Sequence, residues 1–165
     1  MLAKEIVSFL KLRDLTISTM ESCSGGYIIS CITNEEGSSS VTEGGFVTYS
    51  NKQKIKLGVS ESIIKQYGVY SPQTAIEMAR ATFDNMESDV SIGITGTFSN
   101  IDDTNSDSVQ GNVFYSVGIL KENKLIFVSD KIQVPILDRV LQKEYIADII
   151  FEKTLEIINF EYDKI

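Results

Sequence analysis

Apolar residues recur with two different periods along the chain, and these periods predict helices interleaved with strands. Leu2, Ile6 and Phe9 lie at helical spacing, which predicts an opening amphipathic helix. Apolar residues alternate with polar or small ones over 15–20 and 90–94, a pattern typical of β-strands. The same reasoning predicts further strands over 46–49, 112–120 and 125–131, and helices over 27–33, 51–57, 60–66, 72–86 and 138–160.

The order of these elements predicts the fold class. Helices separate the first three strands, whereas only the polar residues 121–124 separate the last two, which indicates a hairpin. Ser71 followed by Pro72 marks a helix start, because serine caps helices and proline suits the first helical position. We therefore expect one α/β domain over 1–165, with three α/β/α layers and a mixed sheet covered by helices on both faces. The buried stripe of the C-terminal helix is expected at Leu141, Tyr145, Ile149 and Ile150.

The overall charge limits the partners that the chain can have. Of its 165 residues, 42% are apolar and 23% are charged, as in soluble globular proteins. Its 15 basic and 23 acidic residues give a formal net charge of −8, and no basic tract offsets this charge. We therefore expect no binding to nucleic acid or to anionic membranes. No signal-peptide core and no apolar run of membrane-spanning length is visible, which predicts a cytoplasmic protein.

The sequence contains no histidine. This excludes Ser-His-Asp hydrolysis, Cys-His proteolysis and HExxH zinc sites, so a general base must be Lys, Tyr, Asp, Glu or Cys. Cys23 and Cys31 form no CxxC pair and suit reduced thiols rather than a disulfide or a metal site. Cys23 is also a candidate nucleophile at a helix start, although packing under the sheet is its expected role. We expect neither a metal nor another cofactor.

A predicted strand-to-helix turn at 21–26 is the first candidate site. Ligands of open α/β sheets bind beyond the carboxyl ends of strands, where this turn would lie. Gly25 and Gly26 let the backbone approach a ligand, the helix start supplies N–H groups for an anion, and Ser22 and Ser24 supply hydroxyls. The alternative is a plain helix cap, in which one serine caps and the glycines only turn the chain.

The segment 49–54, Tyr-Ser-Asn-Lys-Gln-Lys, is the second candidate site. Without histidine, a serine nucleophile needs another base, and a neutral lysine is the usual substitute. Such a lysine must have its pKa lowered from about 10.4 to about 7–8 by burial or by a nearby cation. The alternative is that Lys52, Lys54 and Lys56 form the solvated face of a short helix.

Together, these segments resemble a known family. The residues 21–26, Glu-Ser-Cys-Ser-Gly-Gly, are similar to the ESCTGG motif of the CinA C-terminal domain family. The residues 45–51, Gly-Phe-Val-Thr-Tyr-Ser-Asn, with Lys54 are similar to its GxVTYSNxxK segment, and 37–39 match its Gly-Ser-Ser loop. The resemblance continues through 94–96 and implies an α/β/α domain that hydrolyses nicotinamide mononucleotide (NMN) to nicotinate mononucleotide and ammonia.

The resemblance also implies residue roles. The nucleophile falls on Ser22, the base on Lys54, and Tyr49 assists near them. Backbone N–H groups of residues 24–26 would hold the oxyanion, or alternatively the Ser38-Ser39 loop would. A small-molecule nucleotide is the expected partner, and a homodimer is expected by analogy with the family. The substrate-binding residues so implied are Glu21, Ser24, Gly25, Gly26, Ser38, Ser39, Thr95, Gly96, Arg139 and Lys143.

The chain departs from the family pattern after Gly96. The family continues with Gly-Pro-Gly-Gly, whereas 97–100 read Thr-Phe-Ser-Asn, and the loop through 111 is polar and acidic. Carboxylates near a substrate phosphate would weaken its binding unless they point away. Lys143 also stands where a second arginine is usual, so a bidentate contact is lost. Two hypotheses follow: an amidohydrolase, favoured by Ser22 and Lys54, or an altered or inactive nucleotide-binding member with a different ligand, favoured by the changed loop.

Overall fold

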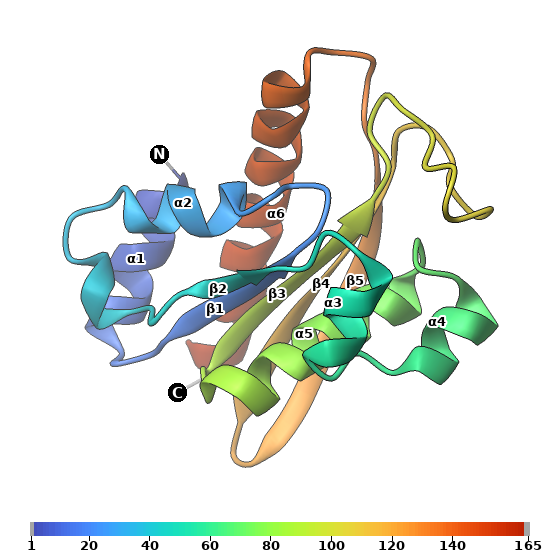
Figure 1. The fold of residues 1–165 in the computed structure, drawn as a ribbon. Coiled ribbons are helices and arrows are strands. Elements are labelled where there is room, and N and C mark those ends of the chain that lie inside the picture. The colour runs from blue at the N-terminus through green and yellow to red at the C-terminus, as the bar shows by residue number, and fades with distance from the viewer. Residues whose placement is uncertain (1, 164–165) are drawn as a thin grey trace.

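The computed structural model describes residues 2–163, and a five-stranded sheet lies at its centre (Figure 1). The strand order is β2-β1-β3-β4-β5. β1 pairs in parallel with β2 and with β3, whereas β3, β4 and β5 pair antiparallel, so the predicted mixed sheet is confirmed. The strands are β1 (Ile17–Glu21), β2 (Gly45–Val47), β3 (Val90–Gly96), β4 (Asn112–Lys121) and β5 (Lys124–Gln133).

Helices cover both faces of the sheet, which gives the predicted three layers (Figure 1). One layer holds α1, α2 and α6, and its apolar side chains share a core cluster with β1, β3 and β4. The other layer holds α3, α4 and α5, with α5 packed along β3 and β4. The helices are α1 (Leu2–Leu12), α2 (Tyr27–Thr33), α3 (Asn51–Lys56), α4 (Glu61–Tyr67), α5 (Pro72–Met86) and α6 (Arg139–Tyr162), and a short 3₁₀ helix, η1, spans Ser38–Ser40. No helix within residues 2–163 is long and apolar enough to span a membrane.

Serine caps begin the three helices of the second layer. Ser71 Oγ accepts the backbone N–H of Thr74 at 3.1 Å, with Pro72 at the first helical position, as predicted. Ser60 and Ser50 cap α4 and α3 in the same way. Each cap satisfies an N–H that has no partner within its own helix, so the local sequence fixes where these helices start.

The hairpin between β4 and β5 is tighter than predicted. Lys121 pairs with Lys124, so only Glu122 and Asn123 form the turn, in place of the four connecting residues expected. Both turn residues have left-handed backbone angles, with φ of 52° and 61°. Consecutive left-handed residues match the twist of a two-residue hairpin, which lets the strands pair up to the turn.

The predicted buried stripe of α6 is largely wrong. Leu141 and Tyr145 are exposed and Ile149 is only half-buried; of the four expected residues, Ile150 alone is fully buried. The buried face of α6 includes two polar residues, Gln142 and Thr154, so it does not stand out as an apolar pattern. Both are buried with their hydrogen bonds satisfied: Gln142 bonds to Ser99 and to the Pro135 carbonyl, and Thr154 donates to the Ile150 carbonyl. The buried residues of α6 are Gln142, Ile146, Ala147, Ile150, Phe151, Thr154, Ile157 and Ile158.

α5 approaches β3 closely because Gly93 has no side chain. A Cβ at this position would lie 2.3 Å from the Ala75 carbonyl oxygen and 2.6 Å from the Ala79 nitrogen. Both atoms belong to the helix backbone, so the helix itself would have to move.

We therefore expect Gly93→Ala to lower the free energy of unfolding by about 3 kcal/mol through overpacking. Urea denaturation followed by circular dichroism measures the change. Ser91→Ala on the same strand is the control, because Ser91 Oγ is buried without a hydrogen-bond partner among the described residues. Its removal deletes an unpaired buried hydroxyl and breaks no hydrogen bond, so it should not lower stability. Equal effects of the two substitutions would contradict this account of the helix–sheet contact.

Candidate active site

The parallel strands bring three chain segments to one edge of the sheet. Glu21 is in register with Val47 of β2 and with Ile94 of β3, so the segments that follow these strands emerge side by side. Ser22 continues this arrangement, since its N–H donates to the Ile94 carbonyl at 3.0 Å. The predicted position of the first candidate site, beyond the carboxyl ends of the strands, is therefore confirmed.

Glu21 holds the turn after β1. Its side chain is fully buried, and its two carboxylate oxygens accept five hydrogen bonds, three of them from backbone N–H groups of the turn and of the first residues of α2. Ser24, also fully buried, donates to it at 2.6 Å. The prediction that Glu21 and Ser24 contact substrate is wrong for this structure, because both side chains form hydrogen bonds within the turn and neither lines the cavity described below. The five donors are Thr19 Oγ1, Ser24 Oγ and the N–H groups of Gly26, Ile28 and Ile29.

Two backbone N–H groups that were expected to hold an oxyanion are also engaged. Gly26 N–H donates to Glu21, and Gly25 N–H donates to the Ser22 carbonyl at 2.9 Å. The helix-cap alternative is therefore correct for the glycines, which turn the chain, and wrong for the serine, because α2 has no side-chain cap at Gly26 and the Glu21 carboxylate accepts the N–H groups of Ile28 and Ile29 instead. Gly25 and Gly26 both have positive φ, so the glycines are needed for the turn itself.

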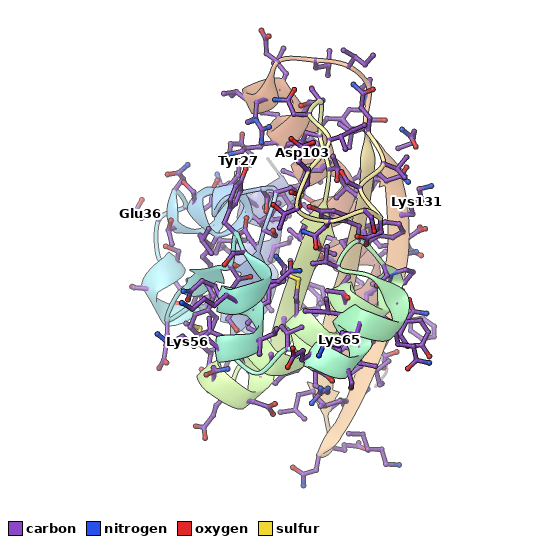
Figure 2. All side chains as sticks on the ribbon, turned by 45° about the vertical axis from the view of Figure 1, so that its right-hand side comes forward. Tyr27, Glu36, Lys56, Lys65, Asp103 and Lys131 are labelled. Carbon is purple, nitrogen blue, oxygen red and sulfur yellow. The ribbon has the colours of Figure 1, made fainter. Side chains whose placement is uncertain are left out.

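Lys54 comes from α3 and points inward to Ser22. Its Nζ lies 3.0 Å from Ser22 Oγ and donates to the Thr48 carbonyl at 2.9 Å. Only 2% of the Lys54 side chain is exposed. The neighbouring Lys52 and Lys56 are exposed, as Figure 2 shows for Lys56, so the predicted solvated face holds for them and fails for Lys54.

The position of Lys54 follows from the corner between β2 and α3. Thr48 N–H donates to the Glu21 carbonyl at 2.8 Å, which extends the β1–β2 pairing by one residue. Ser50 then caps α3, and the first turn of the helix carries Lys54 back over the end of β1. Lys54 and Ser22, which are 32 positions apart in the sequence, are thereby brought within hydrogen-bonding distance.

Burial lowers the pKa of Lys54 towards neutral pH. Loss of hydration lowers the pKa of its amine from an ordinary value of 10.5 to about 8, although Cys23 and the Asp102 carboxylate act in the opposite direction. Burial likewise raises the pKa of the Cys23 thiol to about 12. A protonated thiol is a poor nucleophile, so Ser22 is the stronger candidate of the two.

A cavity of about 510 Å³ opens in front of Ser22 and Lys54. Tyr49 and Arg139 lie at its exposed mouth, where Arg139 Nη1 donates to the Tyr49 hydroxyl at 3.3 Å. Among the predicted binding residues, Gly96 also lines the cavity. The remaining lining residues are Cys23, Ser50, Asn51, Lys52, Tyr70, Thr97, Phe98, Asn100, Asp102, Thr104 and Asn105.

Four other predicted binding residues lie outside the cavity wall. Thr95 is buried and donates to the Val69 carbonyl at 2.9 Å. Lys143 Nζ would lie 3.2 Å from a Cβ built on Gly25, which places it above the turn. Ser38 and Ser39 belong to η1, beyond the far end of α2, and do not line the cavity. The Ser38-Ser39 alternative for the oxyanion therefore does not fit this chain.

Sequence reasoning missed a polar network that orders the loop 97–111 over the cavity. Tyr70 hydroxyl and Asn105 Nδ2 each donate to Asp102 Oδ2 at 2.6 Å. Asn51 Nδ2 donates in turn to Asn105 Oδ1 at 2.8 Å, which ties the loop to α3. These residues come from three segments with no shared motif; the acidic composition of the loop was the only signal. Asp103 lies on the exposed side of the loop (Figure 2).

Comparisons with known proteins agree with this arrangement. The sequence model of one family, described as the CinA C-terminal domain, matches residues 1–149. The nicotinamide-nucleotide amidohydrolase PncC of Escherichia coli K12 is 38% identical over 96 residues, which are 58% of each chain. A CinA-like protein of Chloroherpeton thalassium is 47% identical over 96 residues, 58% of this chain and 23% of that protein. The matched segments thus span less than two thirds of either relative.

The fold is also found in solved structures of the same family. The competence/damage inducible protein CihA of Agrobacterium tumefaciens superposes with a TM-score of 0.83 and 26% identity, over 94% of this chain and 92% of that one. A competence-damaged protein (CinA) superfamily protein of Enterobacter cloacae gives a TM-score of 0.84 and 25% identity, over 95% and 90% of the two chains.

The lowered pKa of Lys54 predicts a pH-dependent cost in stability. Below pH 8 both folded and unfolded chains carry a protonated Lys54, and the folded chain carries that charge buried. Between pH 8 and 10.5 the folded chain releases this proton while the unfolded chain retains it, so stability rises with pH. We expect Lys54→Met to be more stable than the wild type at pH 7, and this advantage to shrink by about 2 kcal/mol by pH 9.5.

Urea denaturation of both proteins across this pH range measures the difference between their free energies of unfolding. The contributions of the other titrating groups cancel in this difference. Lys56→Met is the control: it makes the same change on an exposed side chain of the same helix. A stability difference that does not depend on pH would refute the buried, low-pKa lysine.

Proposed function

The chain belongs to the CinA C-terminal domain family, and we propose that it hydrolyses the carboxamide of NMN to nicotinate mononucleotide and ammonia. The observation that carries the proposal is the 3.0 Å contact between Lys54 Nζ and Ser22 Oγ at the base of the cavity. A buried lysine paired with a serine and held below its ordinary pKa is the arrangement that activates a hydroxyl nucleophile when histidine is absent.

The Thr48 carbonyl orients the base. A neutral Lys54 donates one N–H to this carbonyl, which leaves the nitrogen lone pair facing the Ser22 hydroxyl. Lys54 then takes the hydroxyl proton as Ser22 Oγ attacks the carboxamide carbon. The resulting ammonium gives its proton to the leaving nitrogen, and ammonia departs when the carbon–nitrogen bond breaks. Water, deprotonated by the same amine, releases the acid from the acyl-enzyme and restores Ser22.

The mouth of the cavity provides groups for the rest of the nucleotide. Arg139 and Lys52 are exposed cations there and suit a phosphate. The Tyr49 hydroxyl accepts a hydrogen bond from Arg139, so its own proton is free for the substrate. Tyr49 thus assists from the mouth of the cavity. Because the N–H groups of Gly25 and Gly26 are occupied, they are assigned no part in holding the oxyanion.

A second candidate function is that of a nucleotide-binding member of the family that does not catalyse the reaction on NMN. The observation that favours it is the Asp102 carboxylate, which lines the cavity and belongs to the acidic loop that follows the changed residues 97–100. The two functions predict different results with the same substrate: the enzyme releases ammonia, whereas the binding protein is only stabilised by its ligand.

Release of ammonia from NMN by the purified protein tests the proposal. We expect Ser22→Ala and Lys54→Met to lower kcat by at least about 10³-fold, because each removes half of the catalytic pair. Lys56→Met should leave the rate unchanged. No release from folded wild-type protein, together with a rise in its melting temperature on adding NMN, would favour the binding function.

The pH profile of the same reaction tests the role of Lys54. Because the base must be neutral, kcat/KM should rise about tenfold per pH unit below 8 and level off above it. A profile that is flat or that falls through pH 8 would contradict a lysine base.

A further inference from the structure

Asp102 is the one carboxylate among the residues that line the cavity. Three hydrogen bonds to its oxygens are given by neutral donors: the Tyr70 hydroxyl, the Asn105 amide and the Thr104 N–H at 2.9 Å. These donors, the Tyr70 hydroxyl first, lower the pKa of Asp102 to about 2, so it is ionised at neutral pH. No ion pair within residues 2–163 involves this carboxylate.

The cations around the cavity leave this negative charge without a fixed partner. Arg139 lies at the mouth and bonds to Tyr49, with its guanidinium 5.7 Å from the centre of the Phe98 ring. Lys54 must be neutral to act as a base, so in the reactive form it does not balance Asp102. A ligand carrying a positive charge would supply the missing partner at that moment.

We propose that Asp102 forms a subsite for positive charge, and that the site selects carboxamides carried on an N-alkylated pyridinium ring over the same amides on an uncharged ring. The proposal rests on the proposed function and adds a determinant of specificity to it. In such a substrate the charge lies in the ring that bears the scissile amide. A phosphate attached through the sugar lies at the opposite end of the molecule, and the exposed Arg139 of the cavity lining is a suitable partner for it.

The surroundings of Asp102 fit a flat cation. Tyr70 lines the cavity and holds the carboxylate through its hydroxyl, and Phe98 adds a second aromatic ring to the wall. An organic cation at such a place is attracted by the π faces of the aromatic rings and also by the negative charge of the carboxylate. The Asp102 carboxylate would repel a phosphate. A nucleotide substrate therefore fits beside the acidic loop when its cationic ring, and not its phosphate, faces Asp102.

Binding to a variant that cannot turn over separates this subsite from catalysis. The probes are nicotinamide riboside, a pyridinium cation, and its 1,4-dihydro form, which has the same sugar and amide and an uncharged ring. Isothermal titration into Ser22→Ala gives the two Kd values. We expect the cation to bind more tightly, and the added Asp102→Asn substitution to reduce that preference by about tenfold.

Asp107→Asn is the matched control. It removes the same charge from the same loop, where Asp107 accepts the Tyr70 N–H at 2.9 Å, and it does not line the cavity. The preference for the cation should survive in this control. It should also survive in Tyr70→Phe, which removes a hydrogen bond to Asp102 and keeps the carboxylate.

Several outcomes would overturn the proposal. These are failure of the cation to bind Ser22→Ala, an unchanged preference in Asp102→Asn, or equal loss in Asp102→Asn and Asp107→Asn. If Asp102→Asn binds neither probe, Asp102→Glu decides: a retained preference supports the charge subsite, and a lost one refutes it. Failure of wild-type protein to release ammonia would refute the proposed reaction, while the Kd ratio would still decide on Asp102.

Discussion

The buried carboxylate of Glu21 is the interaction on which the rest of the site depends. It collects three backbone N–H groups and two hydroxyls around the end of β1, so it fixes the turn, the start of α2 and the direction of Ser22 together. A buried charge is tolerated when its oxygens are satisfied in this way, and its loss would leave several donors without partners. Specific hydrogen bonding thereby shapes the part of the chain that carries Ser22.

The buried amine of Lys54 has far fewer hydrogen-bond partners than the buried carboxylate of Glu21. Within residues 2–163 no carboxylate forms an ion pair with this amine, and it bonds instead to a hydroxyl and a carbonyl, so burial favours its neutral form. The fold thus satisfies the buried Glu21 side chain with five hydrogen bonds, whereas burial lowers the pKa of the Lys54 amine. This contrast distinguishes the side chain that holds the turn together from the amine that lies beside Ser22.

Sequence patterns predicted the order of elements, the mixed sheet and the Ser71 cap, because these depend on local periodicity and turn chemistry. The pairing of Ser22 with Lys54 came from the resemblance to a family, since spacing alone left a solvated lysine face open. The stripe of α6 was misjudged because Gln142 and Thr154 are buried with their hydrogen bonds satisfied. The Tyr70–Asp102–Asn105 network could not be predicted, because its members meet only when the loop 97–111 has folded across the sheet.

The shortness of α3 has a consequence for when Lys54 acquires its lowered pKa. Six residues are too few to form a stable helix in isolation, so α3 persists only while Ser50, Thr48 and Ser22 hold it against the completed sheet. In a nascent or partly folded chain, Lys54 is hydrated and protonated like any surface lysine. The lowered pKa of Lys54 therefore depends on a tertiary contact, and it is absent from any chain in which α3 has not docked against the end of β1.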